Sequence, residues 1–249
     1  MAETSFKRLN AVVTGGNKGI RFEICRQLAS NGVLVVLTAR DESRGLQALE
    51  RLKNGDPSLA DYIIFHQLDV ADSCSISSLT NFVTTQFGKL DILVNNAGIL
   101  VDIIDVDAIR AAAGVDKHQG LEVISGAYKL AEECLKANYY GPKQMMETFL
   151  PLLQQSDSPT IICCPCMHVL RHMSKAALNA YSRMIDAKKK KYPNLCINCV
   201  CPGYVKTDIN ANTGTSTAGE GAAGPVKLAL LPDGGPSGRF FHQTEEGSF

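Results

Sequence analysis

The segment Leu9–Leu28, LNAVVTGGNKGIRFEICRQL, constrains the fold most, because it places a strand, a glycine-rich turn and a helix in direct succession. The apolar, β-branched run Leu9–Val13 predicts a buried strand. The turn TGGNKG over residues 14–19 follows, and the residues from Ile20 onward have helical spacing. This order brings a phosphate to a helix N-terminus, where free N–H groups and the positive end of the helix dipole favour an anion.

Strands and helices alternate along the rest of the chain, and this alternation predicts the architecture. Short apolar runs predict strands over Val33–Arg40, Asp61–Leu68, Leu90–Asn95, Thr160–Cys164 and Leu195–Val200, with a last edge strand over Gly238–Phe241. Helical spacing predicts helices over Asp41–Leu52, Asp72–Phe87, Tyr128–Leu153 (disturbed at Gly141-Pro142), Arg171–Lys191 and Ala222–Leu231, with a loop over 101–126. We therefore expect an α/β fold, a Rossmann-type doubly wound parallel sheet in a single domain over residues 1–249.

The composition narrows the class of protein. The 249 residues are 45% hydrophobic, which suits a sizeable core, and 25 basic residues balance 25 acidic ones. Zero net charge gives no reason to expect nucleic acid or an anionic membrane as a partner, and no apolar run approaches the roughly 20 residues of a membrane span. The N-terminus MAETSFKRLN lacks the apolar core of a signal peptide, so we expect a cytoplasmic protein.

The nine cysteines predict reduced thiols rather than disulfides or a metal centre. Their number is odd, and most lie in apolar segments. Cys163-x-x-Cys166 and Cys196-x-x-Cys199 match the spacing of zinc ligands, but both pairs fall on predicted strands, where residues i and i+3 point to opposite faces. We therefore expect no metal site.

Eight segments point to a known family. They are TGGNKGI (14–20), LTAR (37–40), LDV (68–70), LVNNAG (93–98), ANYYG (137–141), SKAALNAYSR (174–183), CVCPGYVKTD (199–208) and EGAAGPVKLALLPDGGPSGRFF (220–241). In these segments the chain resembles the short-chain dehydrogenase/reductase family, most closely its plant neomenthol dehydrogenase and salutaridine reductase-like group of NADPH-dependent carbonyl reductases. The resemblance implies NADP(H)-dependent reduction of a ketone or aldehyde on a small terpenoid- or alkaloid-like molecule, and a monomeric protein.

The resemblance also implies roles for individual residues. Two glycines of the first turn would form the pyrophosphate site, Asp69 would lie beside the adenine, and the Asn95–Gly98 turn would lie beside the adenine ribose. Residues after the last long apolar strand would border the nicotinamide. The implied cofactor-binding set is Thr14, Gly15, Asn17, Lys18, Gly19, Ile20, Arg40, Asp69, Val70, Asn95, Ala97, Gly98, Lys175, Pro202, Gly203, Val205 and Thr207.

The choice between NADP and NAD has an independent physical basis. An acidic residue at the end of the second strand binds the ribose 2′-hydroxyl of NAD. Here that position holds Arg40, and Lys18 lies in the glycine turn. A 2′-phosphate would therefore meet two cations, one of them with a planar fork of donors that suits phosphate oxygens. The alternative is that both are solvated surface charges.

The catalytic residues depart from the family pattern. The family uses a tyrosine as general acid and a lysine four residues later, on the same helix face, that lowers the pKa of the phenol. Lys175 matches the lysine, but Arg171 stands in the tyrosine position and does not release a proton at neutral pH. Cys166 is the nearest counterpart of the substrate-binding serine, and a thiol is a poor hydrogen-bond donor. Asn138 matches the residue that holds a proton-relay water.

Two further departures affect the binding sites. The segment that covers the substrate in the plant group is missing between Cys166 and Arg171, and Arg21 replaces the last glycine of the dinucleotide fingerprint, which predicts weakened cofactor binding. His172 is a candidate substitute acid, weighed against an exposed helix histidine. We carry two hypotheses: an oxidoreductase with severely reduced activity, and a catalytically inactive member that acts as a cofactor-binding or interaction protein or is a defective splice or gene-model product.

Overall fold

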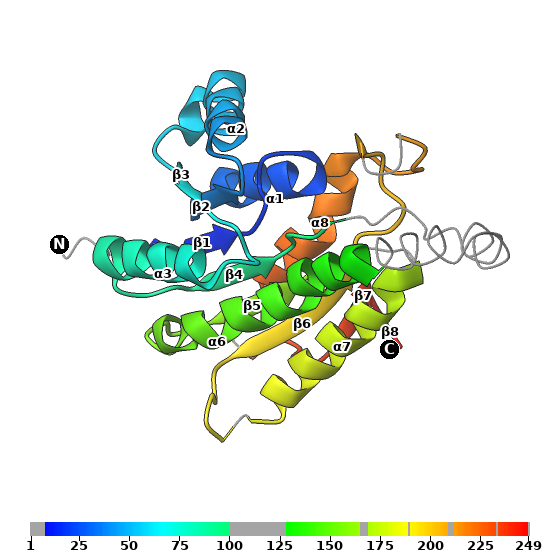
Figure 1. Ribbon diagram of the computed structural model, residues 1–249. Helices are drawn as coiled ribbons and strands as arrows, with labels where there is room; N and C mark the ends of the chain where they lie inside the picture. The colour runs from blue at the N-terminus through cyan, green and yellow to red at the C-terminus, as the bar shows by residue number, and fades with distance from the viewer. Residues whose placement is uncertain are drawn as a thin grey trace, which may run out of the picture.

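The computed structural model describes residues 8–99, 128–164, 169–188, 190–208, 212–232 and 234–248, and for residues 169–175 it describes the backbone alone. Within these residues, eight strands form one sheet in the order β3-β2-β1-β4-β5-β6-β7-β8 (Figure 1). The strands are β1 (Asn10–Val13), β2 (Leu34–Ala39), β3 (Ile63–Gln67), β4 (Ile92–Asn95), β5 (Thr160–Cys163), β6 (Cys196–Cys201), β7 (Phe240–His242) and β8 (Glu245–Gly247).

Helices cover both faces of the sheet. Helices α1 (Gly19–Ser30), α2 (Glu42–Gly55) and α8 (Ala218–Ala229) pack on one face, and α3 (Ser73–Phe87), α6 (Gly141–Leu153) and α7 (Val169–Asp186) lie side by side across the other (Figure 1). Successive residues of β1 show the consequence, since Ala11 and Val13 pack in the first layer and Val12 in the second. Because both faces are buried, the strands read as continuous apolar runs rather than alternating ones.

The strand order places a topological switch point between β1 and β4. From β1 the chain builds outward through β2 to β3, and then returns to add β4 on the other side of β1. In a doubly wound sheet, ligands bind in the crevice outside the carboxyl ends of the strands at such a switch point. The turns that follow β1 and β4 are therefore the place to look for a site.

The observed sheet confirms the doubly wound prediction, with one correction at its edge. Strands β1 to β7 pair in parallel, but β8 pairs antiparallel with β7 and forms the edge. The sequence predicted the strand over Gly238–Phe241, which is β7 in the structure, as the edge. Strand β8 has no apolar pattern that would predict it, since its residues are Glu-Glu-Gly and all are exposed. Short, charged strands are typical of protected sheet edges.

Element boundaries also differ from the predicted ones by a few residues, most of all in the last two long helices. Helix α7 starts at Val169 and ends at Asp186, whereas the prediction ran over Arg171–Lys191. Helix α8 starts at Ala218, four residues before the predicted start, because Thr217 and Glu220 form a capping box that satisfies the first free N–H groups. The predicted loop over 101–126 lies outside the described residues.

The long helix predicted over Tyr128–Leu153 is interrupted by a π-helical turn at Lys136–Tyr140, just before α6. The backbone N–H of Gly141 bonds to the carbonyl of Lys136, five residues back. Pro142 explains the interruption, because proline has no N–H for the carbonyl four residues earlier, which is that of Asn138. The disturbance predicted at Gly141-Pro142 therefore lies one turn earlier, on a residue of the candidate site, as π-turns often do.

In the described part of the chain, no helix is both long and apolar enough to cross a membrane.

Candidate cofactor site and active site

Two turns meet at the switch point between β1 and β4. The first contains Gly15 and Gly19, whose φ angles of 70° and 58° are left-handed and favour glycine. The second is the 95–98 turn after β4. Thr14 joins them, since its buried hydroxyl oxygen accepts hydrogen bonds from the N–H groups of Asn96 (2.9 Å) and Ala97 (2.8 Å).

The N-terminus of α1 opens into this crevice and has the properties of an anion site. Its N-cap residue, Lys18, makes no capping hydrogen bond with its side chain, and the first turn contains no acidic residue. Free N–H groups at the positive end of a helix dipole favour a phosphate. Asn17 and Ile20, both in the predicted cofactor set, flank Lys18 and Gly19 in this same turn.

Two buried polar atoms at the crevice lack partners within the described residues. They are Oδ1 of Asn95 and Nδ2 of Asn96, at the end of β4. Buried polar groups are nearly always hydrogen-bonded, so an orphaned pair at a switch point fits a site that a polar ligand completes. The glycine turn, the open helix end and these two amides together fit the phosphate and ribose groups of a nicotinamide dinucleotide.

The two predicted 2′-phosphate ligands lie on the surface beside this turn. Arg40 directly follows β2 and is exposed, and Lys18 is about half-exposed. The Lys18 Nζ lies 3.2 Å from Oδ2 of Asp208, in an exposed ion pair that contributes little to stability. Lys18 therefore points toward the 202–208 segment, and a phosphate would compete with Asp208 for it.

The predicted adenine-side residues lie in the turn after β3. Asp69 accepts a hydrogen bond from the N–H of Ala71 through Oδ1 (2.9 Å), and its own N–H donates to the hydroxyl of Ser75. Val70 is buried against the start of α6, where a Cβ added at Gly141 would come within 2.7 Å of its carbonyl oxygen. The turn is thus fixed in place, and Asp69 stands at the same edge of the sheet as the glycine turn.

The segment after β6 closes the other side of the crevice. Gly203, next to Pro202, has a φ of 84°, and Val205 is buried and bridges to Ser216. The Cγ2 atom of Thr207 lies 3.3 Å from the position of a Cβ at Gly19, so this segment packs directly over the glycine turn. The structure therefore brings together the predicted residues from the ends of β1, β4 and β6.

Asn138 lies in the π-turn and holds the second turn of the crevice. Its Oδ1 accepts from the N–H of Ile99 (2.9 Å), and its Nδ2 donates to the carbonyl of Ile99 (3.2 Å) and to the sulfur of Cys134 (3.1 Å). Its amide is thus engaged with the chain itself. The water-holding role of Asn138 stays a prediction.

Helix α7 carries the positions of the catalytic tyrosine and lysine. Residues 171 and 175 lie one turn apart on it, and the helix packs against β5, β6 and the π-turn that contains Asn138. The side chains of Arg171, His172 and Lys175 are outside the description, as is Cys166 altogether. The backbone thus places residues 171 and 175 at the helical spacing that was predicted for the catalytic pair.

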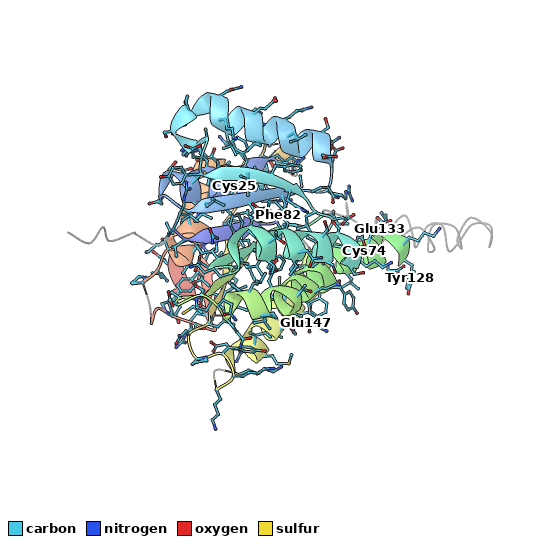
Figure 2. The ribbon with its side chains drawn as sticks, turned by 90° about the vertical axis from the view of Figure 1, so that its left-hand side faces the viewer. Cys25, Cys74, Phe82, Tyr128, Glu133 and Glu147 are labelled. Carbon is cyan, nitrogen blue, oxygen red and sulfur yellow. The ribbon has the colours of Figure 1, made fainter. Side chains whose placement is uncertain are left out.

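Tyr181, the next phenol along α7, is excluded as a substitute acid. Its ring is buried, and its hydroxyl donates a 2.8 Å hydrogen bond to Oε1 of Glu147 on α6. Burial, and then the bond to Glu147, raise the pKa of Tyr181 above its usual range. Figure 2 shows Glu147 on the outer side of α6, so this pair faces away from the crevice.

Three of the cysteines whose spacing matches that of zinc ligands have other partners. Cys163 and Cys199 lie opposite each other on β5 and β6, buried beside Ser182 on α7. A hydrogen bond with Cys199, together with burial, raises the pKa of Cys163, so this thiol keeps its proton. Cys196 points elsewhere, toward the carbonyl of Gly235. In the chain segments that the structure describes, no group of histidine, cysteine and acidic residues could hold a metal ion.

The structure shows where the side chain of Arg21 lies, the residue predicted to replace the last glycine of the dinucleotide fingerprint. Its Nη2 donates to the carbonyl of Gly98 (3.5 Å), and its Nη1 lies 2.8 Å from the position of a Cβ at Gly15. The side chain therefore lies between the two turns. Its position opposes the binding of a dinucleotide, which the other groups of the crevice favour.

Two residues that support the site, Thr38 and Asn96, are not among the predicted site residues. Thr38, on β2, holds the first turn through two hydrogen bonds. Its hydroxyl accepts from the N–H of Gly15 (3.3 Å), and its carbonyl accepts from the N–H of Gly16 (2.6 Å). Asn96 contributes one of the orphaned amides. Both residues lie inside quoted motifs, Thr38 in LTAR and Asn96 in LVNNAG. The bonds of Thr38 to the first turn become visible only when β1 and β2 are paired.

Comparison with known proteins gives concordant results. A family model described as short chain dehydrogenase matches residues 9–218. A (+)-neomenthol dehydrogenase from Arabidopsis thaliana is 46% identical over 291 residues, covering 96% of this chain and 97% of that protein. The solved salutaridine reductase of Papaver somniferum is 40% identical, with a TM-score of 0.76 over 94% of this chain and 99% of that one. A short chain dehydrogenase from Shigella flexneri, solved with NADP, shares the fold at 18% identity (TM-score 0.76, covering 94% and 96%).

Proposed function

The chain belongs to the short-chain dehydrogenase family, whose Rossmann fold binds a nicotinamide cofactor, and from this premise we propose that it binds NADP(H) in the crevice between β1 and β4. The observation that carries the proposal is the pair of turns at the switch point, with an open helix end and with Oδ1 of Asn95 and Nδ2 of Asn96 lacking partners among the described residues. These groups supply hydrogen-bond donors and acceptors for phosphate and ribose.

The charges beside the glycine turn favour NADP over NAD. Arg40 follows β2 at the position where an acidic residue would select the ribose 2′-hydroxyl, and Lys18 lies in the adjacent turn. Arg40 is exposed and able to turn its guanidinium toward a phosphate. The Shigella flexneri protein of the same fold, solved with NADP, supports this choice.

For the lineage we propose reduction of a ketone or aldehyde on a small terpenoid- or alkaloid-like molecule. The names of the neomenthol dehydrogenase and the salutaridine reductase support this substrate class. NADPH supplies a hydride to the carbonyl carbon when bound, and the protein must supply a proton to the carbonyl oxygen. On α7, Lys175 would lower the pKa of a phenol one turn away, but position 171 holds an arginine.

The first of two hypotheses for this chain is a severely impaired enzyme. Arginine does not release its proton at neutral pH, so the general acid is missing, and that loss costs on the order of 10²- to 10⁴-fold in rate. The alignment with the neomenthol dehydrogenase runs over 291 residues, more than the 249 of this chain, so the relative has residues without a counterpart here. This difference supports the prediction that the substrate-covering segment is missing between Cys166 and Arg171.

The second candidate function is a catalytically inactive cofactor-binding or interaction protein, or a defective product of splicing or gene modelling. We favour this alternative for the chain as it stands, because position 171 holds an arginine. A transcript with additional coding sequence between Cys166 and Arg171 would support the defective-product form.

A fluorescence titration with NADPH, with NADH as control, tests the cofactor proposal directly. We expect selective binding of NADPH, because a 2′-phosphate gains charged hydrogen bonds at Arg40. Arg40→Ala should weaken NADPH binding by about tenfold or more and leave NADH binding unchanged, since a hydrogen bond to a charged group contributes roughly 1.5–3 kcal/mol. Arg44→Ala, at an exposed position of α2, is the matched control.

Equal affinity for NADPH and NADH in a folded protein would contradict the choice of NADP. If neither cofactor binds up to millimolar concentration, the assignment of this crevice to a nicotinamide cofactor fails for this chain.

A further inference from the structure

The position of Arg21 in α1 directs its side chain into the crevice. It is the third residue of α1, and helical side chains lean toward the N-terminus of their helix. The stem therefore runs back over the glycine turn, where its Cδ lies 3.3 Å and its Nη1 2.8 Å from the position of a Cβ at Gly15.

The far end of the same side chain reaches the opposite turn. Nη2 donates to the carbonyl of Gly98, and the Cα of Ala97 lies 3.4 Å from that same Cβ position at Gly15. One side chain thus contacts the turn after β1 and bonds to the turn after β4. These are the two strands that flank the switch point.

The local electrostatics of α1 do not account for this arrangement. A cation in the first turn of a helix opposes the helix dipole, and α1 has no acidic residue in its first turn to offset it. The dipole at this end favours an anion, so a guanidinium there occupies a position where a phosphate would bind.

We propose that Arg21 is a strap across the crevice that holds the affinity for the full dinucleotide low while the adenosine end of the site stays accessible. The inference rests on the proposed cofactor site and specifies how this chain differs within it. Two of the groups proposed for the adenosine end, Arg40 and Asp69, follow β2 and β3, away from the β1–β4 gap that Arg21 spans. The third, the 95–98 turn beside the ribose, is bonded to Arg21 through the carbonyl of Gly98. Arg21 would therefore lower the affinity for NADPH more than the affinity for adenosine 2′,5′-bisphosphate.

Calorimetric titration of Arg21→Gly with two probes tests the strap. We expect NADPH to bind the variant about tenfold or more tightly than the unchanged protein, because opening the strap breaks a hydrogen bond from a charged donor. Adenosine 2′,5′-bisphosphate should bind both proteins equally. Arg21→Ala is the second variant, in case glycine in the first turn of α1 prevents folding.

Two further variants separate the causes. Arg26→Gly, on the same helix, removes an arginine that is ion-paired with Glu23 (2.8 Å) and should leave NADPH binding unchanged. Arg21→Met keeps much of the length without the donors, and it should bind NADPH with an affinity between those of the unchanged protein and Arg21→Gly.

The outcomes that overturn the inference are distinct from failure of the cofactor site. Equal NADPH affinity in the unchanged protein and Arg21→Gly would show that the strap has no effect. Weaker binding in Arg21→Gly would show that Arg21 is a counter-charge for the phosphates. A folded Arg21→Gly that binds adenosine 2′,5′-bisphosphate but not NADPH refutes the strap alone, and one that binds neither probe refutes the cofactor site as well.

Discussion

The turns after β1 and β4 are fixed by bonds between main-chain groups and a few short side chains, whereas the catalytic positions on and before α7 depend on single side chains that the sheet does not need. Thr14 holds both turns through the N–H groups of Asn96 and Ala97, and the carbonyl of Thr38 holds Gly16. By contrast, the described contacts of α7 with β5 and β6 are made by Leu178, Ser182 and Ile185.

The two regions therefore respond differently to replacement. Removing a turn residue disturbs the pairing of β1 with its neighbours, so such a change costs stability. The described residues that pack α7 on the sheet lie at least one turn beyond position 171, at Leu178 and Ile185. Tyr128 and Glu133, in the helical segment before the π-turn, are exposed and do not pack in the core (Figure 2).

The largest expected effect comes from restoring the general acid. In the Arg21→Gly background, Arg171→Tyr should raise the rate of ketone-dependent NADPH oxidation by about 10²-fold or more, because a phenol beside Lys175 can donate the proton. The measurement is turnover with a panel of cyclic ketones. Arg171→Phe is the matched control and should give no increase, and an equal gain from both would show that only the removal of arginine matters.

His172 provides a check on the same point. If it replaces the missing acid, His172→Ala should abolish any turnover of the unmodified chain. We expect no change, in agreement with a helix residue that has no role in proton transfer.

The next effect tests the link between the two halves of the sheet. Asp91, at the start of β4, is buried and accepts hydrogen bonds from the N–H of Asn10 (2.9 Å), Lys89 Nζ (2.6 Å) and the hydroxyl of Ser156 (2.6 Å). Asp91→Ala should lower the free energy of unfolding by about 3 kcal/mol or more, because it leaves the partly buried Lys89 unpaired. Urea unfolding measures it, and the exposed Asp61→Ala should change stability by less than about 0.5 kcal/mol.

A smaller effect tests the close packing of the cofactor half. A Cβ at Gly45 on α2 would overlap the ring of Phe65 on β3, so Gly45→Ala should destabilise by about 1–3 kcal/mol. Gly55, at the end of the same helix, has open space around its Cβ position. Gly55→Ala should be neutral or slightly stabilising, since alanine is the better helix former. Equal effects at both positions in thermal unfolding would contradict the packing argument.

The smallest effect concerns pH and the cap of α8. Hydrogen bonds from the N–H and hydroxyl of Thr217 lower the pKa of Glu220 below its usual 4.5. The charged carboxylate therefore stabilises the folded state above pH 4.5, and this contribution is lost as the pH falls through the lowered pKa. Glu220→Gln should be slightly less stable than the unchanged protein at pH 7 and equal to it in strong acid, as measured by thermal unfolding across pH. A difference that persists unchanged into acid would exclude the carboxylate as its cause.

Much of the candidate site could be predicted from the sequence because its residues lie at strand ends. The turn after β1, Asp69 after β3, the turn after β4 and Gly203 after β6 are all marked by short apolar runs that stop at glycine or polar residues. Parallel strands bring their carboxyl ends to one edge, so these residues had to meet once the sheet order was known. The prediction was less complete for Asn138, whose amide bonds to Ile99 become visible only when two distant segments are packed together.

Local periodicity and the identity of single residues were enough to predict the doubly wound sheet and the glycine turn that opens the first helix, and they predict an arginine in place of the family's tyrosine. Only the packed fold showed the strand order that makes the switch point, the antiparallel edge strand β8 and the path of Arg21 from Gly15 to Gly98. Those three depend on which segments lie side by side. An exposed Glu-Glu-Gly becomes a strand only beside β7, and an arginine becomes a strap only where two turns approach within its reach.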